Sequence, residues 1–309
     1  MHQKVSVATI QAAAPAFDID AGINEVERWV AQAADEGAQL IVFPEAFITG
    51  YPKGADFGAR VGYRRPEGRA LFQRYFDAAL DLKSTNAERL AKIAARYRRA
   101  LVVGVIERDG HTLYCTVVYI DTDGSYVGKH RKLMPTGTER LIWGQGDGST
   151  IAPVDMSCGR VGAAICWENY MPMFRMSMYA DGVQLYCAPT VDDRDSWIPT
   201  MRHIATEGRC FVLSSCQFAR RRDFPEDFPT TFDATEDTVL IRGGSCIIDP
   251  YGQPMTTVEY GVERLALATI NLADIPQAKY DLDVSGHYAR ADVFKLLVDR
   301  RARPSVADI

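Results

Sequence analysis

A cysteine stands at the end of an apolar run of small residues, and polar and turn-forming residues follow it at once. The run reads VGAAIC and ends at Cys166, and WENYMP comes next. A side chain where a buried strand meets a helix is held rigidly, faces an open cleft and lies near unpaired N–H groups that favour a thiolate. Cys166 is therefore a candidate nucleophile, and the alternative is a buried structural cysteine.

A carboxylate follows a second apolar run. The segment LIVFPEAFITGYP reads as a short buried strand over 40–43, then a proline and Glu45 between apolar neighbours. An apolar setting raises the proton affinity of a carboxylate, so Glu45 is a candidate general base near neutral pH. The alternative is a glutamate on a surface loop.

A basic run supplies a third type of group. The segment GKHRKLMPTGTER follows a predicted strand and contains Lys132. Such a run is often a solvated positive face or a patch that binds anions. One of its lysines could instead point inward and provide a fixed positive charge.

Together these segments resemble the nitrilase superfamily of carbon–nitrogen hydrolases, whose catalytic set is a Glu, a Lys and a Cys in this chain order. The matching residues here are Glu45, Lys132 and Cys166, and the resemblance runs from about residue 5 to residue 298. This sequence also resembles the nitrilase branch of the superfamily, in which a Trp follows the cysteine. The resemblance to that branch lies in the segments WGQGDGS, LYCAPT, HIATEG, GGS and GHYAR.

The resemblance implies a role for each member of this set. Cys166 attacks the nitrile carbon and forms a covalent thioimidate, for which a thiolate is a suitably strong nucleophile. Glu45 takes the thiol proton and delivers it to nitrogen. Lys132, together with the backbone N–H of Trp167, stabilises the charge of the tetrahedral intermediates.

The resemblance also implies a second carboxylate and a pocket. Glu139 is expected near the nucleophile, where it would orient Lys132 or the hydrolytic water; the alternative is an exposed loop acid paired with the next arginine. Substrate-lining positions in similar nitrilases match Tyr51, Trp143, Trp167 and Thr190. Aromatic residues are often plain core, so the assignment of these residues depends on the resemblance.

We therefore expect a nitrilase that converts an organic nitrile to a carboxylic acid and ammonia. An amidase or a cyanide-hydrolysing enzyme on the same scaffold is the closest alternative, and Trp167 with the WGQGDGS segment favours nitriles. A non-catalytic binding or filament-forming protein is a third possibility, although the catalytic set is intact. No cofactor or metal is expected, because the five histidines and seven cysteines show no ligand spacing.

Composition limits the other classes of function. A chain of 309 residues that is 47% hydrophobic can bury a large core, and no linker interrupts it, so we expect one domain over 1–309 with a short tail from about residue 299. The net charge of −5 and dispersed basic residues disfavour a nucleic-acid partner. The absence of a signal-peptide pattern and of a long apolar run predicts no membrane association and a cytoplasmic protein with reduced thiols.

Strand and helix patterns alternate along the chain, which predicts a mixed α/β fold, and the resemblance implies a four-layer αββα sandwich. Helices are expected over 19–36, 86–99, 173–180 and 196–207, with strands at 4–12, 40–43, 100–107, 113–121, 126–128, 161–165, 184–188, 210–216 and 245–249. Residues 217–237 are expected to form a long surface loop. The apolar helix over 171–181 predicts a homodimer or a larger homo-oligomer.

Overall fold

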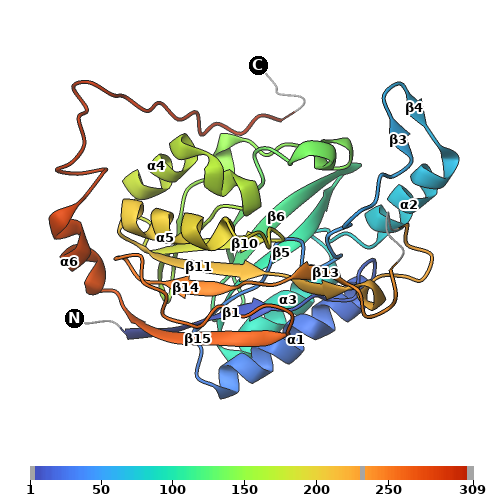
Figure 1. Cartoon of the computed structure of the whole chain (residues 1–309), viewed down its shortest axis with the longest axis horizontal. Helices are drawn as coiled ribbons and strands as arrows, with labels where there is room; N and C mark the ends of the chain where they lie inside the picture. Colours follow the sequence, from blue (N-terminus) through green and yellow to red (C-terminus); the bar gives the residue numbers. More distant parts are fainter. Residues whose placement is uncertain (1–3, 230–233, 305–309) are drawn as a thin grey trace.

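The computed structural model describes residues 4–229 and 234–304. In the first of its two main sheets, the first and the last strand of the chain lie side by side. This sheet has the order β15-β1-β2-β5-β6-β7 (Figure 1). The strands β1, β2 and β5 are parallel, whereas β6, β7 and β15 each run antiparallel to a neighbour. Their bounds are Lys4–Gln11 for β1, Leu40–Val42 for β2, Ala100–Asp109 for β5, Thr112–Ile120 for β6, Tyr126–Arg131 for β7 and Arg264–Asn271 for β15.

The second main sheet has the order β14-β11-β10-β9-β8, with β9, β10 and β11 parallel. Its strands are β8 (Val154–Met156), β9 (Gly159–Ala163), β10 (Leu185–Thr190), β11 (Phe211–Cys216) and β14 (Cys246–Ile248). Two small antiparallel pairs complete the described strands: β3 (Ala59–Arg60) with β4 (Tyr63–Arg64), and β12 (Phe218–Arg220) with β13 (Val239–Arg242).

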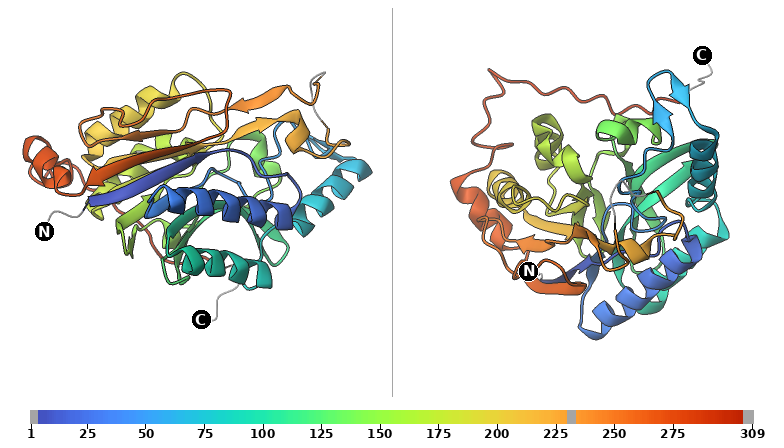
Figure 2. Two further views of the ribbon diagram at one scale, coloured as in Figure 1. Left: turned by 90° about the horizontal axis from the view of Figure 1, so that it is seen from below. Right: turned by 45° about the vertical axis from the view of Figure 1, so that its right-hand side comes forward.

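Helices cover the outer faces of both sheets (Figure 2, left). The α-helices are α1 (Ile19–Asp35), α2 (Pro66–Asp77), α3 (Thr85–Tyr97), α4 (Pro172–Ala180), α5 (Trp197–Gly208) and α6 (Asp274–Asp281). Within residues 4–229 and 234–304, four short 3-10 helices lie in the connections: η1 (Gly137–Leu141), η2 (Gly148–Thr150), η3 (Cys166–Tyr170) and η4 (Arg221–Asp223). The β3–β4 hairpin and α2 project at one end of the molecule (Figure 1).

Alternation of side chains along the strands divides the buried residues among three layers of packing. Val7 and Val42 of the first sheet face Val161 and Leu213 of the second. The opposite face of the first sheet packs on α1 and α3 through Ile10, Ile41, Val103, Val26 and Leu90. The outer face of the second sheet packs on α4 and α5 through Tyr186, Val212, Phe174, Met178 and Ile204. The order of layers is therefore helix, sheet, sheet, helix, which confirms the expected αββα sandwich.

The expectation of a surface loop over residues 217–237 was wrong at its start. Gln217 is buried, and Phe218 begins β12, which pairs with β13 and is itself buried. The charged residues and prolines that follow concealed this short strand in the sequence, and part of the segment, residues 230–233, lies outside the described residues.

The last regular element is α6, and residues 282–304 contain turns but neither helix nor strand. This segment crosses back over the second half of the chain (Figure 1). Arg300 forms an ion pair with Asp181 at 2.6 Å, and the Arg303 amide donates to Asp147 at 2.8 Å.

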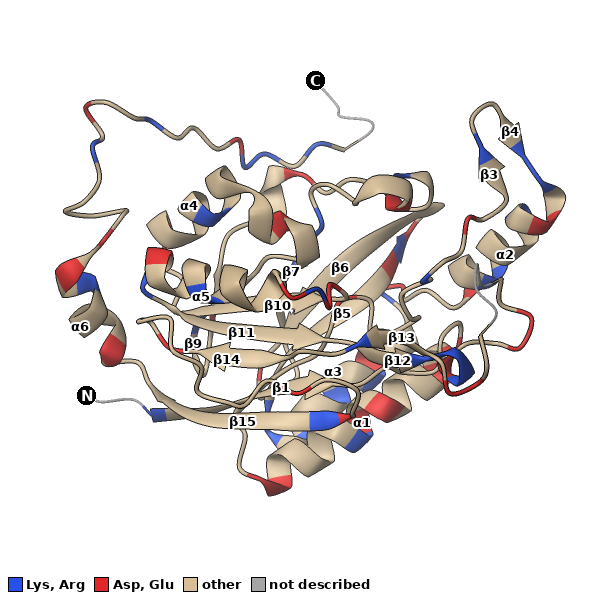
Figure 3. Ribbon diagram, in the orientation of Figure 1, with Lys and Arg blue, Asp and Glu red and all other residues tan. Residues whose placement is uncertain are grey.

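Among the described residues, no helix has both the length and the apolar character needed to span a bilayer. Lysines and arginines are interspersed with aspartates and glutamates over the whole ribbon (Figure 3), in keeping with the dispersed charge seen in the sequence.

Candidate active site

The candidate catalytic residues lie just beyond the carboxyl ends of strands from both sheets. Glu45 follows β2, and Lys132 follows β7 directly. In the second sheet Cys166 follows β9, while Thr190 is the last residue of β10. Since β2 and β7 run in the same direction, as do β9 and β10, each sheet presents its pair of side chains at one edge.

The two predicted carboxylates and the predicted lysine form one buried cluster. Lys132 Nζ donates to Glu45 Oε1 at 2.7 Å and to Glu139 Oε2 at 2.9 Å. Lys132 and Glu45 are at most 1% exposed, and Glu139 is 8% exposed. Glu139 is thus not an exposed acid paired with its neighbouring arginine. It lies in η1, where its Oε2 also accepts from the Thr136 amide at 2.6 Å.

Burial and the neighbouring charges set the protonation of this cluster. Burial raises the pKa of Glu45, Lys132 lowers it and Glu139 raises it again, with a net rise above the usual value. Burial lowers the pKa of Lys132, but the neighbouring acidic groups, Glu45 above all, outweigh this effect, so the pKa lies well above its usual value. Lys132 is therefore a fixed cation, and Glu45 holds a proton more readily than an ordinary glutamate, as its apolar flanks predict.

The Glu45 side chain is only partly satisfied by hydrogen bonds. Its Oε1 accepts from Lys132 and from Cys115 Sγ, the latter at 3.5 Å. Its Oε2 is buried and has no hydrogen-bond partner within the described part of the chain. A buried carboxylate oxygen without a donor is costly, so this atom is poised to accept a proton.

The backbone around Glu45 is tightly held. Gln217 Nε2, at the end of β11, donates to the carbonyls of Glu45 at 2.7 Å and Ala46 at 3.2 Å. Gly104 of β5 passes so close that a Cβ there would lie 2.0 Å from the Pro44 carbonyl oxygen. These contacts join the Glu45 turn to both sheets.

Cys166 occupies a strained turn. It is the first residue of η3, its φ is +51°, and it is 4% exposed. The Thr190 hydroxyl donates to its Sγ at 3.3 Å. A non-glycine residue in this region of φ costs energy, and such residues cluster at functional sites.

The protonation of Cys166 differs from the expectation that helix N–H groups would favour a thiolate. Cys166 begins a short 3-10 helix, with α4 starting only at Pro172. Burial raises the pKa of the Cys166 thiol, Glu45 raises it further, and Lys132 lowers it only in part. The resting residue is therefore a thiol, which requires a base to become a nucleophile.

Of the four predicted pocket residues, Tyr51 and Trp167 line the cavity that holds Cys166, whereas Trp143 and Thr190 are buried and contact residues of its lining. Tyr51, Glu139, Cys166 and Trp167 line a hollow of about 260 Å³. The Tyr51 hydroxyl donates to Glu139 Oε1 at 2.8 Å. The centroid of the Trp143 ring lies 5.7 Å from the centroid of the Tyr51 ring. Lys132 Nζ lies over the Trp143 ring, 5.7 Å from its centroid. Trp143 is buried, so it supports the cluster from behind.

Asp192 organises the other wall of the cavity. It is 7% exposed, accepts from Trp167 Nε1 at 2.9 Å and donates its backbone N–H to Thr190 Oγ1 at 2.8 Å. Arg194 forms an ion pair with Asp192, and its guanidinium lies over the Trp167 ring. Trp167 itself is 42% exposed at the mouth of the cavity.

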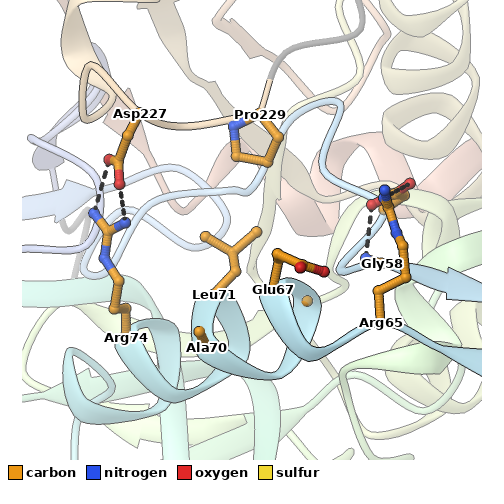
Figure 4. A pocket seen from close by; sticks show the side chains of 10 residues that line it. Gly58, Arg65, Glu67, Ala70, Leu71, Arg74, Asp227 and Pro229 are labelled. Atoms are coloured by element: carbon orange, nitrogen blue, oxygen red, sulfur yellow. Dashed lines mark hydrogen bonds and ion pairs between the residues drawn. The ribbon is translucent and has the colours of Figure 1, made fainter.

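A second hollow of about 300 Å³ shares Tyr51, Lys53 and Glu139 with the first. Its remaining lining is largely apolar and includes Pro52, Phe57, Leu141 and Ile142. The hollow of Figure 4 is a different one, between α2 and the chain near Asp227, where Arg74 pairs with Asp227 at 2.7 Å. None of the predicted site residues lines it.

Several residues of the site were not identified from the sequence, among them Cys115, Asp192 and Gln217. Each follows or belongs to a strand whose end faces the cavity, but the sequence separates Gln217 from Glu45 by 172 residues. The signal available was a polar residue just beyond a buried strand: Gln217 directly follows β11, and Asp192 comes two residues after the end of β10. The described residues contain no cluster of His, Cys, Asp and Glu that would hold a metal ion.

Comparison with known proteins gives consistent results. The family model described as carbon-nitrogen hydrolase matches residues 6–280. The chain is 52% identical to an aliphatic nitrilase of Sinorhizobium fredii, with 98% of each chain covered. It is 50% identical to the bifunctional nitrilase/nitrile hydratase NIT4B of Nicotiana tabacum, over 95% of this chain and 86% of the relative.

A solved structure shares the fold at low identity. The carbon-nitrogen hydrolase of Helicobacter pylori superposes with a TM-score of 0.74 at 18% identity, covering 95% of this chain and 97% of that one. Fold, family model and close relatives agree, and the chain therefore belongs to the carbon-nitrogen hydrolase family.

Proposed function

We propose that the protein is a nitrilase that hydrolyses an organic nitrile to a carboxylic acid and ammonia, with Cys166 as the covalent nucleophile. The observation that carries the proposal is the placement of the Cys166 thiol in a cavity that it shares with Glu139, beside the buried Glu45–Lys132 pair. Relatives about half identical over nearly the whole chain are named nitrilases, which supports the same reaction here.

The first step needs a base, because the resting Cys166 is a thiol. Glu45 accepts the proton on its unpaired oxygen as Sγ bonds to the nitrile carbon, and it then passes this proton to the nitrile nitrogen. The product is a thioimidate, R–C(=NH)–S–Cys166, in which no proton has been gained or lost overall. The raised pKa of Glu45 suits a group that must both take and return a proton.

Two waters complete the reaction. The first adds to the thioimidate carbon, and the tetrahedral intermediate expels ammonia to leave a thioester. The second adds to the thioester carbon, and the carboxylic acid leaves as the Cys166 thiol re-forms. Lys132 stabilises the negative charge that develops in each tetrahedral intermediate, and Glu139 holds Lys132 in position for this task.

The apolar hollow that adjoins the cavity of Cys166 would hold the organic substituent of the nitrile. It shares Tyr51 and Glu139 with the reaction cavity, and its lining of Pro52, Leu141 and Ile142 suits a hydrocarbon group. Trp167 and Thr190 would bound the reacting end of the substrate.

The protein is further proposed to act in the cytoplasm as one domain over 1–309 and as a homodimer or larger homo-oligomer. All seven cysteines are free, which suits a reducing compartment. Met173 at the start of α4 is 73% exposed, and the nearby Tyr170 is 40% exposed, which supports a contact between copies on this face.

The function is tested by measuring ammonia release from aliphatic, aromatic and arylacetonitrile substrates, with simple amides and cyanide assayed in parallel. We expect turnover of at least one nitrile class at a rate well above that of any amide. Cys166→Ala should abolish this turnover, whereas Cys210→Ala, a change at a buried cysteine of the outer core, should retain it. Amide hydrolysis without nitrile hydrolysis would contradict the proposal.

A further inference from the structure

Glu168 is a buried acid two residues beyond the nucleophile, and the reaction described above gives it no chemical role. It lies in η3 and is 1% exposed. Its Oε2 accepts from the Ile165 amide at 2.7 Å, and its Oε1 accepts from the Leu133 amide at 2.7 Å. One of these amides directly precedes Cys166 and the other directly follows Lys132, so a single carboxylate joins the two chain segments.

His130 holds the Glu168 carboxylate from the third side. His130 lies in β7, is 1% exposed, and its Nε2 lies 2.9 Å from Glu168 Oε2. The other ring nitrogen, Nδ1, lies 3.2 Å from the Thr150 carbonyl oxygen, and the ring packs 5.4 Å from that of Phe174. Contacts at both ring nitrogens and on one face thus hold the imidazole in place, with its Nε2–H donating to Glu168, and it cannot turn away without losing this buried hydrogen bond.

The turn at Cys166 needs such support. The positive φ of Cys166 costs about 1–3 kcal/mol and persists only where surrounding contacts determine it. Asn169 Nδ2 donates to the Ala164 and Cys166 carbonyls at 2.9 and 2.7 Å, which secures the turn internally. Glu168 is different, because it secures the turn relative to Lys132, which belongs to the other sheet.

We propose that Glu168, supported by His130, is a positioning residue that sets the separation between the Cys166 sulfur and the Lys132 ammonium. The inference rests on the proposed roles of these two groups, and it adds a residue that touches neither substrate nor the reacting atoms. Since both groups act mainly in the transition state, a small displacement lowers turnover far more than substrate affinity.

The test is Glu168→Gln, assayed with the nitrile that the wild-type enzyme turns over fastest. The glutamine amide nitrogen must face either the Leu133 amide or the Ile165 amide, so the link to one of the two chain segments is lost while the volume of the side chain is kept. We expect kcat to fall on the order of a hundredfold, with KM changed by less than about threefold. Iodoacetamide should still modify Cys166, which distinguishes misplacement from loss of the proposed nucleophile.

Glu107→Gln is the matched control. Glu107 of β5 is 2% exposed and accepts from Thr116 at 2.9 Å and from Arg131 Nε at 2.9 Å, but it contacts neither the Cys166 turn nor Leu133. Its variant should lose thermal stability while kcat stays within about threefold of the wild type. Equal losses of kcat in the two variants would overturn the proposal, as would a Glu168→Gln enzyme with wild-type kcat.

His130→Gln provides a second route if Glu168→Gln does not fold. The glutamine amide can still donate to Glu168 but cannot also reach Thr150, so the support is weakened and not removed. A fall in kcat of about tenfold or more at nearly constant KM is expected. Unchanged kcat in a folded His130→Gln enzyme would overturn the proposal. If the wild-type protein itself showed no nitrilase activity, the proposed function would be refuted instead.

Discussion

Two carboxylates share one ammonium group at the base of the cavity, and this arrangement explains how a thiol can react there. Burial raises the pKa of Glu45, and Glu139, the second carboxylate beside Lys132, raises it further, although Lys132 itself lowers it. Burial and Glu45 also raise the pKa of the Cys166 thiol. The thiolate nucleophile therefore needs a base to form, and Glu45 is the group proposed to take the thiol proton.

Replacement of Lys132 tests its role at the residue scale. Lys132→Met removes the cation that stabilises the tetrahedral intermediates, and kcat should fall on the order of a hundredfold to a thousandfold. KM should change little, because the charge acts mainly in the transition state. Steady-state kinetics measure both. Lys129→Gln, which removes a partner of Glu107, is the control and should retain activity. A raised KM with unchanged kcat would contradict the assignment.

The pH dependence of kcat/KM tests the coupling between the two carboxylates. In the free enzyme Glu45 must be ionised to act as a base, so activity rises as pH increases through its pKa, which lies above the ordinary value of 4.5. Because Glu139 contributes to this rise, Glu139→Gln should lower the pKa and move the acid limb to lower pH. Profiles over about pH 4 to 9 would show the shift. An unmoved or upward-shifted limb would contradict it.

At the scale of elements, the strand ends were the most informative feature of the sequence. Glu45 and Cys166 could each be assigned to the end of an apolar run, and Lys132 to a basic run that follows a strand. The structure places Lys132 against Glu45 and places Cys166 in the cavity beside them. Their catalytic roles stay predictions. The residues that hold them could not be inferred, because contacts such as that between Gln217 and Glu45 depend on how two sheets face each other and leave no local pattern.

The helices and strands themselves could also be predicted only in part. Long periodic segments such as α1 and β5 were located to within about two residues. The strand β15 pairs with β1 from the opposite end of the chain, and the helix α2 and the strand β12 lie in segments rich in charge. None of these three was identified, because pairing partners and tertiary burial determine them more than local propensity.

Gly104 allows a test of the contact between β5 and the Glu45 turn. A Cβ at this position would lie 2.0 Å from the Pro44 carbonyl oxygen and 2.9 Å from Glu45 Cα, so Gly104→Ala must push the turn away. We expect a loss of about 1–3 kcal/mol in the free energy of unfolding and a fall in kcat. Denaturant melts and kinetics measure these effects. Gly22→Ala is the control: its Cβ would have ordinary contacts at 3.6 Å, and both properties should be preserved.

In the molecule as a whole, the two sheets pack face to face around one shared interior. The surface around α4 is the part of the exterior that we propose as a contact between copies. Most of α4 is buried against the second sheet, so the apolar run in the sequence is largely explained by the core. Met173 and Tyr170 remain exposed, and the segment 282–304 crosses this half of the chain (Figure 1).

Self-association on this face can be measured by size-exclusion chromatography with light scattering. The wild type should have a mass that is a multiple of 34.3 kDa. Met173→Asp places a charge in the contact and should shift the distribution towards the monomer. Met255→Asp, at another exposed methionine, should leave it unchanged. A wild-type protein that stays monomeric at high concentration would contradict the proposed oligomer.

Covalent attachment of a nitrile to Cys166 can be measured by trapping the intermediate. The enzyme is mixed with excess nitrile, quenched in acid within the first turnover, and analysed by intact mass spectrometry and peptide mapping. We expect a thioimidate or thioester adduct on the peptide that contains Cys166, and no such adduct in Cys166→Ala. Nitrile turnover by Cys166→Ala at the wild-type rate, or an adduct located on another residue, would contradict this expectation.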